Sequence, residues 1–317
     1  MTAWQPEPPA TGGAGAIANE ALLIEAAING GRDRSEVAAV PYAPAEIAVE
    51  AKRCAEAGAT VVHLHARSQT GGWTAAAPLY AEALALCREA APGLLLSISS
   101  IRPDGVPVEA VLDLLATLAA DPATTPDLVS VNLGHIAVWE PLVGSTVRRR
   151  TVHYPNGYED VAQILEICGR CSIRPELGVM DLGFVSNAVA LRDDGLLPES
   201  PWFLIELDAA GWGAGPQVAP ATAGNYDALV AAMGRTFPDA RWAAHGQGGG
   251  AYAVARRAIE AGHHVRVGFE DMVALPDGAP AESNADLVAW AVRVAGATGR
   301  SIASLPEARH IVGSAPR

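Results

Sequence analysis

The sequence is short of cysteine and of basic residues. It has four cysteines in 317 residues, too few for the disulfide framework that stabilises small secreted domains. Lysine and arginine total 22 against 35 acidic residues, a net charge of −13, which argues against a surface for nucleic acid or anionic membrane but allows a local basic pocket. Cys168 and Cys171 have the spacing of a redox motif, but no second pair accompanies them. We assign them no redox or metal role.

Long apolar runs are also missing. No stretch approaches the roughly 18 apolar residues that a membrane span needs, and residues 1–18 lack the basic and apolar regions of a signal peptide. These absences predict a cytoplasmic protein. Residues 1–18 are rich in proline, glycine and alanine, so we expect a flexible arm there. The rest, residues 19–317 of a chain that is 50% apolar, has enough material for one catalytic domain.

Extended and helical patterns alternate along the chain. The expected strands are 21–28, 60–65, 94–99, 128–133, 174–179, 202–207, 241–245 and 265–270. The expected helices are 45–57, 78–90, 108–119, 158–168, 186–194, 225–236, 250–261 and 284–298. Eight such units predict a parallel sheet closed into a (β/α)8 TIM barrel. An open doubly wound sheet is the alternative, but no Gly-x-Gly-x-x-Gly loop follows the first strand. The later glycine-rich segment 246–250 is either a tight turn or a phosphate-binding loop.

Polar residues gather where the expected strands end, although buried parallel strands should be almost wholly apolar. They are His63, His65, Ser97, Ser99, Ser130, Asn132, Glu176, Glu206, Asp208, His245, Arg266 and Glu270. The carboxyl ends of barrel strands are where active sites lie. Burying so many polar groups without a ligand or metal would be costly, so their clustering predicts a functional site at this end of the barrel.

His63 and His65 are spaced i, i+2 on an expected strand, which points both imidazoles to one face. A carboxylate from Glu270, on the last expected strand, would complete a set of three ligands with open positions. Such a set suits zinc or another divalent cation acting as a Lewis acid. A structural interpretation stays open for each residue: the histidines as core residues, and Arg266 as a buried arginine paired with Glu206 or Asp208.

Several motifs together resemble the β-keto acid cleavage enzyme family. They are AAING at 26–30, VHLHAR at 62–67, HVRVGFED at 264–271 and SNA at 283–285. The resemblance implies a zinc-dependent (β/α)8 barrel, usually a homotetramer. It also implies an exchange of acyl groups between a β-keto acid and acetyl-CoA, which gives acetoacetate and a new acyl-CoA.

The resemblance also implies roles for residues at matching positions. The zinc ligands would be His63, His65 and Glu270. Asp271 would be the general base, and Arg266 would position it or tune its pKa. The residues expected to line the substrate pocket are Ser99, Ser130 and Asn132.

The chain departs from the family pattern at two cationic residues near the expected pocket mouth, Arg32 and Arg102. They suggest a substrate with a second anionic group, such as a β-keto dicarboxylate. Contacts with CoA phosphates or with a second subunit are alternative roles. Two other functions stay open for the whole chain: a metal-dependent hydrolase of the amidohydrolase type, and a barrel that binds a metal or ligand without catalysis.

Overall fold

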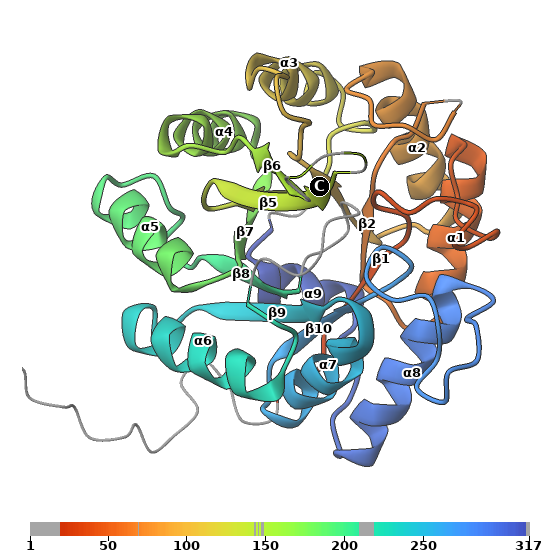
Figure 1. Cartoon of the computed structure of the whole chain (residues 1–317). Coiled ribbons are helices and arrows are strands. Elements are labelled where there is room, and N and C mark those ends of the chain that lie inside the picture. The colour runs from red at the N-terminus through yellow and green to blue at the C-terminus, as the bar shows by residue number, and fades with distance from the viewer. Residues whose placement is uncertain are drawn as a thin grey trace, which may run out of the picture.

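The computed structural model describes residues 20–314, apart from 69, 143, 145, 147, 148 and 209–218. Its centre is a closed barrel of parallel strands in the order β1-β10-β9-β8-β7-β4-β3-β2 (Figure 1). The barrel strands are β1 (Ile24–Ala27), β2 (Val61–Leu64), β3 (Leu95–Ser99), β4 (Leu128–Asn132), β7 (Arg174–Val179), β8 (Trp202–Leu207), β9 (Arg241–Gly246) and β10 (His264–Val267). The prediction of a (β/α)8 TIM barrel is confirmed. The expected arm, 1–18, lies outside the described residues.

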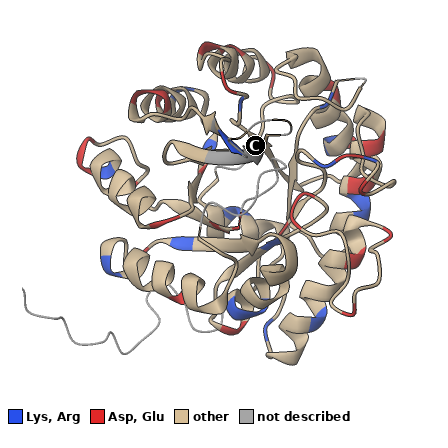
Figure 2. Ribbon diagram, viewed as in Figure 1, with Lys and Arg blue, Asp and Glu red and all other residues tan. Residues whose placement is uncertain are grey.

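Helices form a ring around the strands (Figure 1). They are α1 (Pro44–Ala57), α2 (Ala77–Ala90), α3 (Glu109–Leu118), α4 (Tyr158–Cys171), α5 (Leu182–Asp193), α6 (Ala223–Thr236), α7 (Ala251–Glu260) and α8 (Asn284–Ala297). Outward-facing strand residues such as Val62, Leu64 and Val129 are buried against this ring. Acidic and basic residues are spread over the outer helices (Figure 2). No helix in the described ranges is long and apolar enough to cross a membrane.

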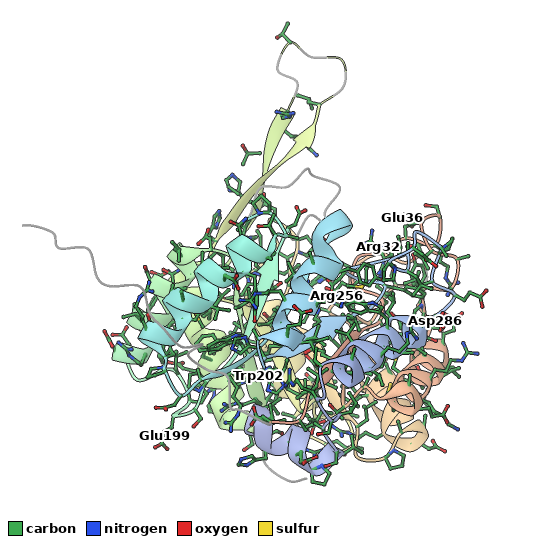
Figure 3. The ribbon with its side chains drawn as sticks, turned by 90° about the horizontal axis from the view of Figure 1, so that it is seen from below. Arg32, Glu36, Glu199, Trp202, Arg256 and Asp286 are labelled. Atoms are coloured by element: carbon green, nitrogen blue, oxygen red, sulfur yellow. The ribbon has the colours of Figure 1, made fainter. Side chains whose placement is uncertain are left out.

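Four elements were not expected. An antiparallel hairpin, β5 (Ile136–Pro141) and β6 (Arg149–Tyr154), follows β4 and extends away from the barrel (Figure 3). A short 3-10 turn, η1 (Gly248–Gly250), precedes α7, and a last helix, α9 (Leu305–Val312), follows α8. Helix α9 packs Ala308, Ile311 and Val312 against inward-facing strand residues at the amino end of the barrel. It therefore closes the end opposite the polar strand termini.

The expected strand 265–270 ends early. Strand β10 stops at Val267, and Gly268 has φ 143°. A Cβ atom at Gly268 would lie 2.1 Å from the carbonyl oxygen of Ala27, so only glycine fits this turn. The backbone N–H of Glu270 then donates to the same Ala27 oxygen at 3.1 Å. Glu270 consequently enters the barrel mouth from a tight turn rather than by the alternation of an extended strand.

Candidate active site

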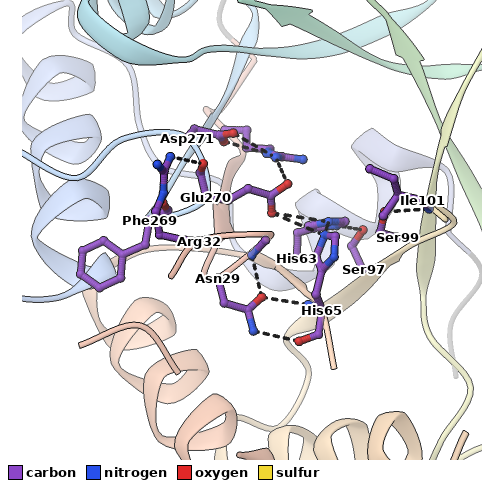
Figure 4. Close-up of polar contacts among 12 residues, drawn as sticks. Asn29, Arg32, His63, His65, Ser97, Ser99, Ile101, Phe269, Glu270 and Asp271 are labelled. Atoms are coloured by element: carbon purple, nitrogen blue, oxygen red, sulfur yellow. Dashed lines mark hydrogen bonds and ion pairs between the residues drawn. The ribbon is translucent and has the colours of Figure 1, made fainter. Parts of the chain in front are cut away.

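His63 of β2, His65 just after β2 and the carboxylate of Glu270 meet at the carboxyl end of the barrel (Figure 4). The Nε2 atoms of His63 and His65 are 3.1 Å apart. Oε2 of Glu270 lies 3.8 Å from Nε2 of His63 and 3.7 Å from Nε2 of His65. Zinc bonded to three such atoms at about 2.0–2.1 Å would separate them by roughly 3.3 Å. The spacing of the three atoms thus suits a divalent metal ion.

The surroundings of these three side chains also fit a metal ion. Among the described residues, Oε2 of Glu270 has no hydrogen-bond partner although it is buried. Burial lowers the pKa of His63 to about 3 and also lowers that of His65, so both imidazoles are neutral and offer lone pairs. Nδ1 of His63 lies 2.9 Å from the Ser97 hydroxyl, a contact that leaves Nε2 for the metal when Nδ1 carries the proton.

Asn29, which follows β1, holds the backbone of His65 in place (Figure 4). Its amide Nδ2 donates to the His65 carbonyl at 2.8 Å, and its Oδ1 accepts from the His65 N–H at 2.9 Å. The same Oδ1 accepts from the N–H of Gly30 at 2.9 Å. This double contact fixes where β2 ends, and therefore where the His65 ring points.

Arg266 links Glu270 to Asp271. Its Nη2 lies 2.8 Å from Oε1 of Glu270, and its Nε and Nη2 donate to the two oxygens of Asp271 at 2.9 and 3.1 Å. Burial would raise the pKa values of both carboxyl groups, but the Arg266 charge outweighs it and their pKa values are lowered. The carboxylates that pair with Arg266 are thus Glu270 and Asp271, rather than the Glu206 and Asp208 of the structural interpretation.

His245 and Glu206, two of the polar residues predicted to gather at the strand ends, extend this network although neither is among the residues predicted to act in the site. Nδ1 of His245 lies 3.1 Å from Oδ1 of Asp271, and its Nε2 lies 3.5 Å from Oε2 of Glu206. Burial alone would lower the pKa of His245, but the neighbouring Asp271 charge raises it to about 9. The signal was present in the sequence, because both residues stand among the polar residues at the strand ends.

A second group of carboxyls lies deeper in the barrel. Glu25 and Glu176 are fully buried, and together with His63 they offer ligand atoms within 4.8 Å of one another. Burial raises the pKa of both carboxyl groups, most strongly for Glu25. The indole N–H of Trp202 donates to Glu176 at 2.9 Å. These carboxyls lie beneath the upper histidine–glutamate set and share His63 with it.

Two cavities open above His63, His65 and Glu270. The inner one, of about 60 Å³, is lined by these three residues and by Ser99, Ser130, Asn132, Glu206, Gln247 and Arg266, with Ile101, Ile136, Tyr154 and Met180 completing the wall. The outer one, of about 540 Å³, shares His65, Ile101, Gln247 and Glu270 with it and reaches Arg32, Arg67, Trp73 and Arg102. The expected pocket residues Ser99, Ser130 and Asn132 therefore lie in one wall of the inner cavity.

Arg32 and Arg102, at which the chain departs from the family pattern, line the outer cavity but already have protein partners. Arg32 donates to the carbonyls of Phe269 and Glu270 at 3.0 and 2.9 Å and pairs with Glu36 at 2.7 Å. Arg102 is 2% exposed and pairs with Asp160 at 2.6 Å. Asp271 is also buried, at 1% exposure, and contacts two residues that line the inner cavity: Arg266, and Gln247, whose amide donates to it at 3.4 Å.

The remaining sequence features lie apart from His63, His65 and Glu270. Segment 246–250 forms the end of β9 and the η1 turn. A Cβ at Gly250 would lie 1.9 Å from the Ala221 carbonyl oxygen, so close packing already accounts for that glycine. Cys168 and Cys171 lie in α4, and all four cysteines are free.

Comparison with known proteins places this arrangement among related chains. The model of the beta-keto acid cleavage enzyme family matches residues 21–313. The 3-keto-5-aminohexanoate cleavage enzyme of Fusobacterium nucleatum subsp. nucleatum is 31% identical over 296 residues, covering 92% of this chain and 98% of that protein. The 3-oxoadipate:acetyl-CoA acetyltransferase of Cupriavidus necator is 27% identical over 294 residues, covering 92% and 94%. The apo structure of ObcA, at 18% identity, superposes with a TM-score of 0.70 over 86% of this chain and 65% of that one, a likeness of fold.

Proposed function

This chain belongs to the β-keto acid cleavage enzyme family, and on that premise we propose that it converts a β-keto acid and acetyl-CoA into acetoacetate and a new acyl-CoA. The observation that carries the proposal is the meeting of His63, His65 and Glu270 with Arg266 at one cavity. The names of two relatives support it, because one cleaves a 3-keto acid and the other is an acetyl-CoA acetyltransferase.

The proposed reaction balances without a redox partner. A base removes a proton from C2 of the β-keto acid, and C2 then bonds to the carbonyl carbon of acetyl-CoA and displaces the CoA thiolate. The thiolate attacks the original keto carbon, the bond between C2 and C3 breaks, and a proton returns to C2. Each carbanion formed at C2 is delocalised onto a neighbouring keto oxygen, so the site must stabilise a developing oxyanion.

We propose that His63, His65 and Glu270 hold a zinc ion, or another divalent cation, at this site. The ion would supply Lewis-acid stabilisation of the oxygen charge and would acidify the carbon beside the keto group. The unpartnered Oε2 of Glu270 and the neutral imidazoles support this assignment.

Asp271 is the proposed proton acceptor, and Arg266 is the residue that positions it. The lowered pKa of Asp271 keeps it ionised, which makes it available but weakly basic. It therefore suits only a carbon acid whose proton is already acidified. Arg266 and Gln247 both line the inner cavity and donate to Asp271, so they connect this carboxylate to the proposed substrate space.

The inner cavity is proposed to hold the β-keto acid, with Ser99, Ser130 and Asn132 as polar contacts, and the outer cavity to admit the acyl end of acetyl-CoA. The expectation of a dicarboxylic acid rested on two cationic side chains, Arg32 and Arg102, near the pocket mouth. Because Glu36 and Asp160 pair with those guanidinium groups, the geometry lends this expectation no support. Arg32 and Arg102 remain proposed residues of the cavity mouth, near the path to CoA.

Mass spectrometry of purified protein tests the proposal. The protein is incubated with acetyl-CoA labelled with ¹³C in both acetyl carbons and with a panel of β-keto acids. We expect both labels in C3 and C4 of acetoacetate and an unlabelled new acyl-CoA, both abolished by a chelator and restored by zinc. Bound metal without acyl exchange for any acid would contradict the proposal. Chelator-sensitive hydrolysis of amides or lactones without CoA would favour the amidohydrolase alternative.

A homotetramer and a cytoplasmic location stay predictions from the family resemblance and the sequence. Light scattering of the purified protein would measure its oligomeric state. A mass near 130 kDa, four times the 32.7 kDa chain, is the expected result.

A further inference from the structure

Gln247 lies where the cavities of the barrel mouth meet. It follows β9 and lines the inner cavity, the outer cavity and a third cavity, of about 580 Å³, that lies beside the η1 turn and residues 271–276. Among the described residues, no other lines all three cavities. A ligand that reaches the inner cavity from either of the larger ones therefore crosses a boundary that includes Gln247.

The Gln247 amide is oriented by Asp271. Its Nε2 lies 3.4 Å from Oδ1 of Asp271, and Arg266 donates to both oxygens of that carboxyl group, as it would to a carboxylate. Turning the amide would place its oxygen against these acceptor oxygens, so the NH₂ group faces Asp271. One N–H is thereby engaged. The second has no acceptor within the described part of the chain.

The boundary between the inner and outer cavities offers few donors. The residues that line both cavities are His65, Ile101, Gln247 and Glu270. His65 and Glu270 are proposed metal ligands, and the side chain of Ile101 is apolar. That leaves Gln247 as the boundary residue whose side chain is available to donate a hydrogen bond to a second ligand.

The proposed reaction needs a donor at this boundary. The β-keto acid is proposed to fill the inner cavity and the acyl end of acetyl-CoA to enter through the outer one, so C2 and the thioester carbonyl meet where the two cavities join. When C2 bonds to the carbonyl carbon, the electron pair of the C=O double bond moves to the oxygen. The oxygen carries this charge until the CoA thiolate leaves, and a donor aimed at it lowers the barrier.

We propose that Gln247 is a catalytic residue whose second amide N–H donates to the thioester oxygen of acetyl-CoA and stabilises the oxyanion formed when C2 attacks. The first N–H, toward Asp271, keeps the amide in this orientation. Gln247 retains both protons throughout, and no step needs an oxidant. This inference rests on the proposed function.

Gln247→Met tests the role, because methionine keeps the length of the side chain and removes its donors. We expect kcat for acyl exchange to fall about 10²–10³-fold, the effect of losing one oxyanion donor. Exchange of the C2 proton of the β-keto acid with deuterated solvent, measured without CoA, should stay close to the wild-type rate. Gln163→Met, at an exposed position in α4, is the matched control and should change neither rate.

The two rates separate catalysis from positioning. If Gln247 only held Asp271 in place, C2 exchange and acyl exchange would fall together in Gln247→Met, and that result would overturn the proposal. Unchanged acyl exchange in a folded variant would overturn it as well.

Infrared spectroscopy of bound acetyl-CoA gives a readout that does not depend on turnover. The carbonyl band is identified from the difference between acetyl-CoA with and without ¹³C at that carbon, each bound to zinc-loaded protein. A hydrogen bond weakens the C=O bond, so the band should lie at lower frequency in the wild type than in Gln247→Met. Equal frequencies, or no binding of acetyl-CoA to the wild type, would overturn the proposal. A lower wild-type frequency without acyl exchange for any acid would support the donor and contradict only the proposed function.

Discussion

The two ends of the barrel are built from the same strands and have opposite chemistry. At the amino end, inward-facing residues such as Val61, Leu128 and Leu204 pack with α9 in an apolar layer. Two residues further along the same strands, the inward positions are His63, Ser130 and Glu206, which line the inner cavity. The amino end of the barrel, closed by α9, thus buries apolar surface, and the open carboxyl end buries charged groups.

The difference shows how stability and chemistry are divided within one fold. Burial of apolar surface contributes roughly 25 cal/mol per Å², whereas buried charges such as Arg266 and Asp271 cost free energy that their pairing only partly recovers. The amino end, closed by α9, therefore stabilises the barrel, and the carboxyl end holds groups that are costly to bury. If this division holds, substitutions at the two ends should affect different measurable quantities.

The largest expected effect is on catalysis at the carboxyl end. His65→Ala removes one proposed metal ligand, and we expect kcat to fall on the order of a thousandfold, since a metal ion contributes several kcal/mol to transition-state stabilisation. Metal content measured by plasma mass spectrometry should fall with it. His310→Ala is the control, because His310 is exposed and lies in α9 at the amino end. It should keep both the kcat and the metal content of the wild type. Full activity of His65→Ala would contradict the claim that the carboxyl end of the barrel carries the catalytic groups.

Asp271→Asn should have the next largest effect. The amide keeps the size of the side chain but cannot accept a proton, so kcat should fall by about 10²–10⁴-fold while the metal stays bound. Exchange of the C2 proton of the β-keto acid with deuterated solvent, followed by NMR, should slow in parallel. If exchange and turnover are retained, another group is the base. Asp277→Asn, in an exposed turn, serves as the matched control.

At the amino end, Ile311→Ala should change stability rather than catalysis. Ile311 is 6% exposed in the apolar layer under the barrel, and truncating such a side chain lowers the free energy of unfolding by about 2–4 kcal/mol. Urea unfolding measures this loss. We expect kcat of the folded variant to stay within twofold of the wild type; a much larger fall would show that the two ends are coupled.

The smallest effect concerns the charge network around His245. Its pKa is raised in the folded protein to about 9, so its stabilisation is fully present below the unfolded pKa of about 6.5 and is lost as pH rises through about 9. Between pH 6.5 and 9.5 the melting temperature of the wild type should therefore drop a few degrees more than that of His245→Gln. If the melting temperatures of the two proteins fall equally over this pH range, His245 is not charged in the folded protein.

Much of the fold could be predicted from the sequence because buried apolar strands alternate with helices, most of which have clear periodicity. The hairpin β5–β6 was missed since it makes no strand pairing with the barrel. Helix α9 is only eight residues long, yet a signal existed: Ser304 caps it and Glu307 completes a capping box, with Gly313 after its end. Short elements are hard to predict because local cues are weak without the packing that stabilises them.

The site was less predictable than the fold. The i, i+2 spacing of His63 and His65 is local, so their convergence followed from strand geometry. The contacts of Arg102 with Asp160, and of His245 with Asp271, join residues on different elements, and no local pattern encodes such partners. Arg32 illustrates the same limit, because its guanidinium turns to the carbonyls of Phe269 and Glu270 rather than to open solvent.

Anomalous diffraction at the zinc edge, from a crystal of the protein soaked with a β-keto acid, tests most directly whether a metal ion lies between His63, His65 and Glu270. We expect one strong peak within about 2.3 Å of His63 Nε2, His65 Nε2 and a Glu270 oxygen, with the acid bound beside it in the inner cavity. A peak elsewhere, or a fully zinc-loaded protein without density between these three residues, would contradict the claim that the carboxyl end is assembled around a metal ion.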